Sequence, residues 1–107
     1  MDLKATGEEI QVSVKQAKVR SEVPFAALVE QMAEEASELA HALLKYARAI
    51  RRENPTPVTL DEARANVVEE YTDLLLVGDI LCLKGSIMGY EEKLDRWIDR
   101  NSELQSG

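Results

Sequence analysis

The chain has 107 residues, which is the size of one domain with a single core. A composition of 45% hydrophobic and 31% charged residues predicts a folded protein and excludes an intrinsically disordered one. The net charge of −7 excludes nucleic acid as the main partner, because phosphate backbones are bound by clustered lysine and arginine side chains.

Two helices are predicted in the first half of the chain. Residues 7–20 carry apolar side chains at helical spacing, and the segment 21–24 ends this helix. The second helix begins near Pro24, because proline is tolerated in a first helical turn. Its apolar residues repeat at intervals of three and four and form one stripe: Phe25, Leu28, Val29, Met32, Ala36, Leu39, Leu43, Ala47 and Ile50. Arg51 and Arg52 add positive charge at its C-terminal end, which the helix dipole favours.

Two more helices are predicted after the break at residues 54–57, where two prolines prevent a helix from continuing. Thr59 followed by Glu62 has the pattern of a capping box, so the third helix starts there. It extends to about Lys84, just before a glycine, and the last helix covers residues 90–104. No segment has the sustained alternation that is typical of a strand.

The second half of the third helix, residues 74–83, is apolar on nearly every face. A helix of this kind is buried on all sides, and a subunit of four helices has few ways to surround it. We therefore expect an all-α, four-helix bundle-like subunit that forms a single domain over residues 1–107. Part of its helical core is expected to be shared between subunits, in a homodimer or homotetramer.

The cellular location can also be predicted. Residues 74–83 are the longest apolar run, which Asp79 interrupts, and they are too few to span a bilayer. Asp79 itself has two open interpretations. It either binds a metal-bound water or a basic residue, or it is a polar group in the core whose hydrogen bonds are satisfied. The first residues carry no secretory signal pattern. The single cysteine, Cys82, excludes a disulfide framework, and we interpret it as a small buried apolar residue. We expect a cytoplasmic protein without a membrane partner.

Two acidic clusters, residues 34–38 and 69–73, carry the candidate chemistry. Each pairs two carboxylates three residues apart, on one face of a helix. Two such pairs facing each other would repel unless cations lay between them, and Mg²⁺ and Mn²⁺ prefer an all-carboxylate site. The helical register places Glu35 and Glu70 where helices meet, whereas Glu34 points away. From the residues alone, a metal site and two solvated acidic helix faces are equal alternatives.

These clusters resemble the signature of a known family. The first has the form Glu34-Glu35-x-x-Glu38, and the second contains Glu70-x-x-Asp73. This order is similar to the E-E-x-x-E … E-x-x-D pattern of the all-α nucleoside triphosphate pyrophosphohydrolases, the MazG-like group. That group also includes helical dUTP and dCTP hydrolases and phosphoribosyl-ATP pyrophosphohydrolase.

The resemblance extends beyond the acidic residues and covers residues 23–100. Gln31 precedes the first cluster, as a glutamine often does in the family. The last helix contains Lys93, Arg96 and Arg100, which resemble the basic K-x-x-R…R pattern of the shorter, phage-type members.

The resemblance implies hydrolysis of a nucleoside triphosphate to the monophosphate and pyrophosphate, with Mg²⁺ as cofactor and Mn²⁺ as an alternative. Four carboxylates would bind the metal: Glu35, Glu38, Glu70 and Asp73. Either Glu34 or Glu69 would help to hold or activate the attacking water. Three basic side chains would contact the triphosphate: Lys93, Arg96 and Arg100. Members of the family are typically dimers or tetramers.

Two other classes of protein stay open. His41 lies three residues after Glu38, and this pair is the unit that helical di-iron carboxylate proteins use, with Glu70 as a further ligand. An ordinary histidine on a polar helix face is the competing interpretation. The other class is a non-catalytic helical interaction module, in which the acidic clusters keep the protein soluble, the basic residues of the last helix form surface ion pairs and Trp97 belongs to the core.

Overall fold

The computed structural model describes residues 6–53, 58–85 and 88–106. Four α-helices follow one another along the chain: α1 (Gly7–Glu22), α2 (Phe25–Arg51), α3 (Leu60–Ile80) and α4 (Tyr90–Ser106). Over these described ranges no strand occurs, so the expected all-α class is confirmed. None of the helices that the structure describes is both long enough and apolar enough to cross a membrane.

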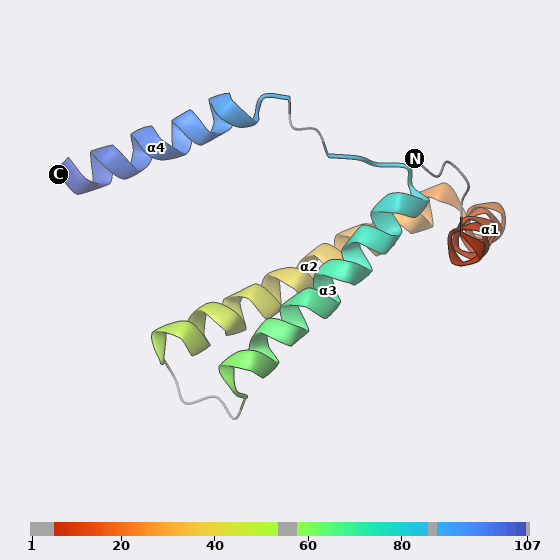
Figure 1. Cartoon of the computed structure of the whole chain (residues 1–107), viewed down its shortest axis with the longest axis horizontal. Coiled ribbons are helices and arrows are strands. Elements are labelled where there is room, and N and C mark those ends of the chain that lie inside the picture. Colours follow the sequence, from red (N-terminus) through yellow and green to blue (C-terminus); the bar gives the residue numbers. More distant parts are fainter. Residues whose placement is uncertain (1–5, 54–57, 86–87, 107) are drawn as a thin grey trace.

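The four helices do not close into a bundle within one chain. α2 and α3 lie side by side as an antiparallel hairpin, which contains most of the contacts between helices (Figure 1). α1 contacts the C-terminal end of α3, where Arg20 Nη1 donates a hydrogen bond to the carbonyl of Ile80 at 3.2 Å. α4 stands apart from the hairpin (Figure 1). The number and order of the helices are as expected. The bundle-like subunit with a shared helical core is not formed by the single chain and stays a prediction for the assembled protein.

The core lies between α2 and α3 and is small. Its apolar side chains are the buried ones of the hairpin: Leu28, Leu39 and Ala42 from α2, and Ala63, Val77 and Ile80 from α3. The stripe predicted for α2 is therefore only partly buried, because one helix covers less than the whole stripe. Phe25 and Leu43 from the same stripe remain exposed.

The N-cap of α3 is where the sequence predicts it. Thr59 has an extended backbone, and its hydroxyl accepts a hydrogen bond from the backbone N–H of Glu62 at 3.1 Å. A second cap of this type opens α1, where Thr6 and Glu9 exchange side-chain and backbone hydrogen bonds as a complete capping box. These caps satisfy N–H groups that have no partner within the helix, and so they define where the helices begin.

The C-terminal end of α3 differs from the prediction. The helix ends at Ile80, four residues before Lys84, because Cys82 adopts a left-handed backbone with φ of 59°. The N–H of Cys82 bonds to the carbonyl of Asp79 at 3.0 Å, and the N–H of Leu83 bonds to Gly78 at 2.9 Å. This pair of bonds is a Schellman motif. Cys82 is consequently exposed on the turn, so its interpretation as a buried residue is wrong.

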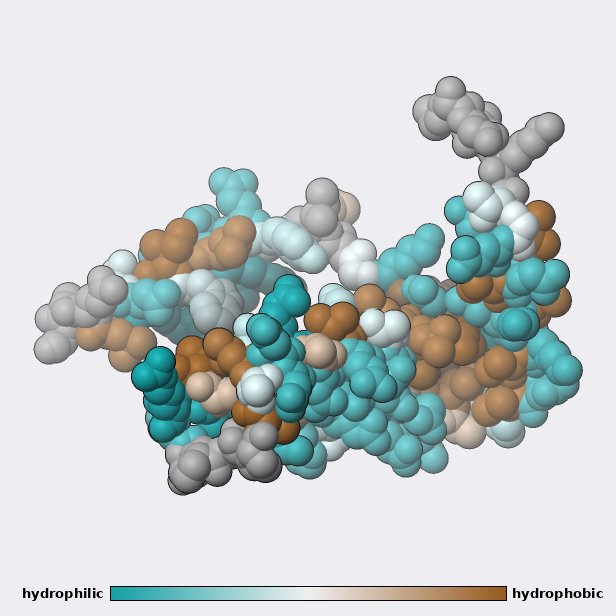
Figure 2. Space-filling model, turned by 60° about the horizontal axis from the view of Figure 1, so that its bottom comes forward, coloured by the Kyte–Doolittle hydropathy of each residue, from teal (hydrophilic) through white to brown (hydrophobic). Residues whose placement is uncertain are grey.

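The apolar second half of α3 is not buried on all sides in one chain. Leu75 and Leu76 are 49% and 51% exposed, while Val77 and Ile80 are buried. The whole chain exposes 9233 Å², whereas a compact protein of 12.0 kDa exposes about 6,000 Å². Its radius of gyration is 18.7 Å, compared with about 13 Å for a compact chain of this length. Figure 2 shows hydrophobic side chains in exposed patches on the face in view.

Candidate metal centre

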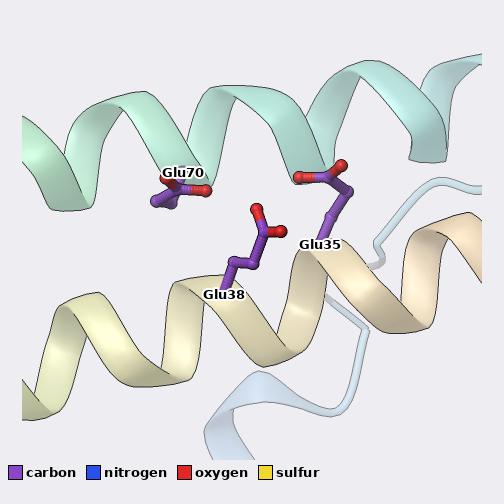
Figure 3. A group of neighbouring side chains, drawn as sticks. All are labelled: Glu35, Glu38 and Glu70. Carbon is purple, nitrogen blue, oxygen red and sulfur yellow. The ribbon is translucent and has the colours of Figure 1, made fainter.

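Three glutamates meet between α2 and α3. Glu35 and Glu38 extend from α2 toward α3, and Glu70 lies on α3 opposite them (Figure 3). One carboxylate oxygen of each side chain lies within 4.8 Å of the other two. Oxygens bound to one Mg²⁺ are at most about 4.2 Å apart, so a small side-chain rotation would bring all three onto one ion.

Helix geometry explains why these residues come together. Glu35 and Glu38 are three residues apart and therefore share a face of α2. Their face borders the packed stripe, which points Glu35 into the seam between the helices and leaves it half-buried. Gln31 lies one turn before Glu35, and its Nε2 donates a hydrogen bond of 2.8 Å to Oε1 of Glu35.

The seam leaves two carboxylate oxygens without partners. Oε2 of Glu35 and Oε2 of Glu70 are both buried, and neither accepts a hydrogen bond. Burial raises the pKa of Glu70 above its usual value, and a hydrogen bond with Glu38 and the negative charges of Glu38, Asp73 and Glu35 raise this pKa further. A buried anionic oxygen without a partner is costly. A divalent cation would satisfy both oxygens, so the donor set fits Mg²⁺ or Mn²⁺.

The other acidic residues predicted for the site lie around the three glutamates. Asp73 is half-buried on α3 and lies outside the group with the 4.8 Å spacing, but it is near enough for its charge to raise the pKa of Glu70. Glu34 and Glu69 are exposed and are not members of the group. The roles assigned to these three residues by the family resemblance stay predictions.

The basic residues predicted to bind phosphate are not brought to the glutamates in the single chain. Lys93, Arg96 and Arg100 all belong to α4, which stands apart from the hairpin (Figure 1). Arg96 forms an ion pair with Glu92 at 3.5 Å, and Arg100 lies over the ring of Trp97 at 5.0 Å. Trp97 is 63% exposed, so it is not a core residue of the isolated chain.

His41 and Asp79 take no part in the group of glutamates. His41 is exposed on α2 and lies outside the group, so the structure does not assemble a Glu-x-x-His metal site among the described residues. Asp79 is exposed in a groove beside α1, near Glu8 and Glu9, and is therefore not a core polar residue.

One contact of the site was not predicted from the sequence. Gln31 entered the sequence interpretation only as part of a motif, and its hydrogen bond with Glu35 was not foreseen. The signal for it was present, because a glutamine and a glutamate four residues apart are neighbours on a helix.

Comparisons of the chain with protein-family models, with curated proteins and with solved structures find no match. The resemblance to the pyrophosphohydrolases therefore rests on the short sequence motifs alone.

Proposed function

We propose that this protein is a Mg²⁺-dependent nucleoside triphosphate pyrophosphohydrolase. One observation carries the proposal: Glu35, Glu38 and Glu70 converge between two helices with two of their oxygens buried and unpaired. The same three residues occupy acidic positions of the motif that resembles the pyrophosphohydrolase signature. An acidic protein can bind a triphosphate in this way, because the cation reverses the local charge.

The protein's own groups would divide the chemistry as follows. Glu35, Glu38 and Glu70 would hold Mg²⁺, with Asp73 beside them. When bound, the ion neutralises charge on the phosphate oxygens. Either of the exposed carboxylates next to the ligands, those of Glu34 and Glu69, would hold the attacking water and accept its proton. The oxygen of this water forms a bond to the α-phosphorus, the bond to the bridging oxygen breaks, and pyrophosphate leaves.

A homodimer or homotetramer belongs to the same proposal. It is supported by the large accessible surface of the single chain and by the exposed apolar residues of α3. In such an assembly, Lys93, Arg96 and Arg100 would approach the triphosphate and stabilise the leaving pyrophosphate. The exposed thiol of Cys82 suits a reducing compartment, so we also propose a cytoplasmic location.

The test is a screen for pyrophosphate release from the common ribo- and deoxyribonucleoside triphosphates with Mg²⁺. We expect release from at least one of them, and we expect Glu38→Gln to lower it at least a hundredfold with the fold intact by circular dichroism. Glu30→Gln is the matched control, because it removes the same charge from an exposed position on α2 outside the group. Full activity in Glu38→Gln, or no release and no response to Mg²⁺ or Mn²⁺, would contradict the proposal.

A further inference from the structure

The two oxygens of the Glu35 carboxylate have different surroundings. Oε1 accepts the hydrogen bond of 2.8 Å from Nε2 of Gln31, on the exposed side of α2. Oε2 is buried and has no hydrogen-bond partner. Within the part of the chain that the structure describes, Gln31 is the one neutral side chain that donates a hydrogen bond to any of the three glutamates.

We infer that Gln31 is a positioning residue that determines which oxygen of Glu35 is offered to a divalent cation. A donor on Oε1 holds the carboxylate in one rotation, so that Oε2 stays buried and free of hydrogen bonds. Partners of this kind orient metal ligands and strengthen metal binding. Because the donor is a neutral amide, it leaves the negative charge of the group intact. This inference rests on the metal site in the proposed function.

A simpler role for Gln31 would be to stabilise the helix. Glutamine and glutamate one turn apart form a weakly stabilising pair on any exposed helix. That role would affect the unfolding of the protein and would leave its affinity for metal unchanged. Metal affinity, measured separately from stability, therefore separates the two roles.

The test compares Mn²⁺ binding to the full chain with Mn²⁺ binding to Gln31→Met. Binding is measured through the electron paramagnetic resonance signal of free Mn²⁺. Methionine keeps the length of the side chain and the helix propensity but has no donor. We expect Mn²⁺ affinity to fall about tenfold, with an unchanged unfolding midpoint in EDTA. Gln11→Met is the matched control, because Gln11 is exposed on α1 and lies outside the metal centre.

A second variant tests whether Gln31 acts through Glu35. In a Glu35→Ala background, where the hydrogen bond has no acceptor, Gln31→Met should change Mn²⁺ affinity less than twofold. The side-chain amide signals of Gln31 in nuclear magnetic resonance spectra should shift when Glu35 is replaced by Ala, even without metal.

The outcomes separate the inference from the proposed function. Equal Mn²⁺ affinities of the unaltered chain and Gln31→Met overturn the role of Gln31 and leave the metal site standing. A loss of affinity of the same size in the Glu35→Ala background shows that Gln31 acts elsewhere and also overturns the inference. An unaltered chain that binds no Mn²⁺ overturns both the site and the role of Gln31.

Discussion

The carboxylate of Glu70 is destabilising when it is charged and unpaired, and it is also one of the proposed metal ligands. Its carboxylate lies in the seam of the hairpin with Oε2 buried, and three other carboxylates act on it. Burial and repulsion favour the protonated form, which raises the pKa. If the group binds Mg²⁺ as proposed, a proton and the cation would compete for the same oxygens. Without either of them, the glutamates oppose the packing of α2 on α3.

The raised pKa of Glu70 predicts how the stability of the metal-free protein depends on pH. The pKa of Glu70 is raised in the folded protein above its usual value of 4.5. Its contribution to stability is fully present below pH 4.5 and is lost as the pH rises through the raised value. In EDTA, the unaltered chain should therefore lose stability as the pH rises from 4.5 through the raised pKa of Glu70. Glu70→Gln should remove this loss. The measurement is urea unfolding of both proteins from pH 4 to 8.

The matched control for this pH series is Glu69→Gln, because Glu69 is exposed on α3 and is not a member of the group. It should keep the pH dependence of the unaltered chain. Parallel curves for Glu70→Gln and the unaltered chain would show that Glu70 does not titrate as described.

At the scale of single residues, helical register predicted part of the site. Glu35 and Glu70 were expected at the boundary between helices, and both are half-buried there. Glu38 was selected mainly through the motif, and it joins them in space. The position of Asp73 outside this group could not be predicted, because side-chain rotation decides which carboxylates meet and the sequence pattern contains no information on it.

At the scale of the elements, helix beginnings were easier to predict than helix ends. The cap at Thr59 depends on a side-chain hydroxyl, so the residue type alone indicates it in the sequence. The end of α3 uses a backbone arrangement at Cys82, a residue type that rarely adopts positive φ. The apolar residues around it continue the helical pattern, so nothing in the sequence marks the turn. The same left-handed conformation occurs at Arg52, after α2, where no glycine signals it either.

The left-handed turn after α3 leads to a prediction about stability. Cys82 has a φ of 59° and an exposed side chain, so glycine would relieve backbone strain there without removing buried surface. We expect Cys82→Gly to increase the free energy of unfolding by about 1 kcal/mol relative to Cys82→Ala. Chemical denaturation of the two variants measures this difference. Equal stability of the two variants, or a less stable glycine variant, would contradict the assigned end of α3.

At the scale of the whole molecule, the single chain leaves much of its apolar surface exposed. The stripe of α4 consists of exposed apolar residues: Tyr90, Leu94, Trp97, Ile98 and Leu104. Charged residues occupy the other faces of α4. The sequence predicted the helices themselves, since each depends on local periodicity. How they pack depends on contacts between distant segments, and the stripes indicate only that a partner surface is needed.

This surface leads to a prediction about assembly. We expect the protein to have at least twice the mass of the 12.0 kDa chain in solution, by light scattering coupled to gel filtration. Leu94→Asp places a charge in the stripe of α4 and should lower the mass to that of one chain. Ser102→Asp adds the same charge outside the stripe and should leave the mass unchanged. A monomeric unaltered chain, or an assembly that tolerates Leu94→Asp, would contradict this prediction.

The 9233 Å² of accessible surface has a consequence for how the protein persists in a cell. In the proposed assembly, a chain with so small a core of its own would gain much of its stability by mass action, when other copies cover it. Newly made subunits at low abundance would spend longer exposed to proteases than the same subunits at high abundance. Turnover would therefore slow as synthesis rises, and expression level would set the half-life of the protein as well as its amount.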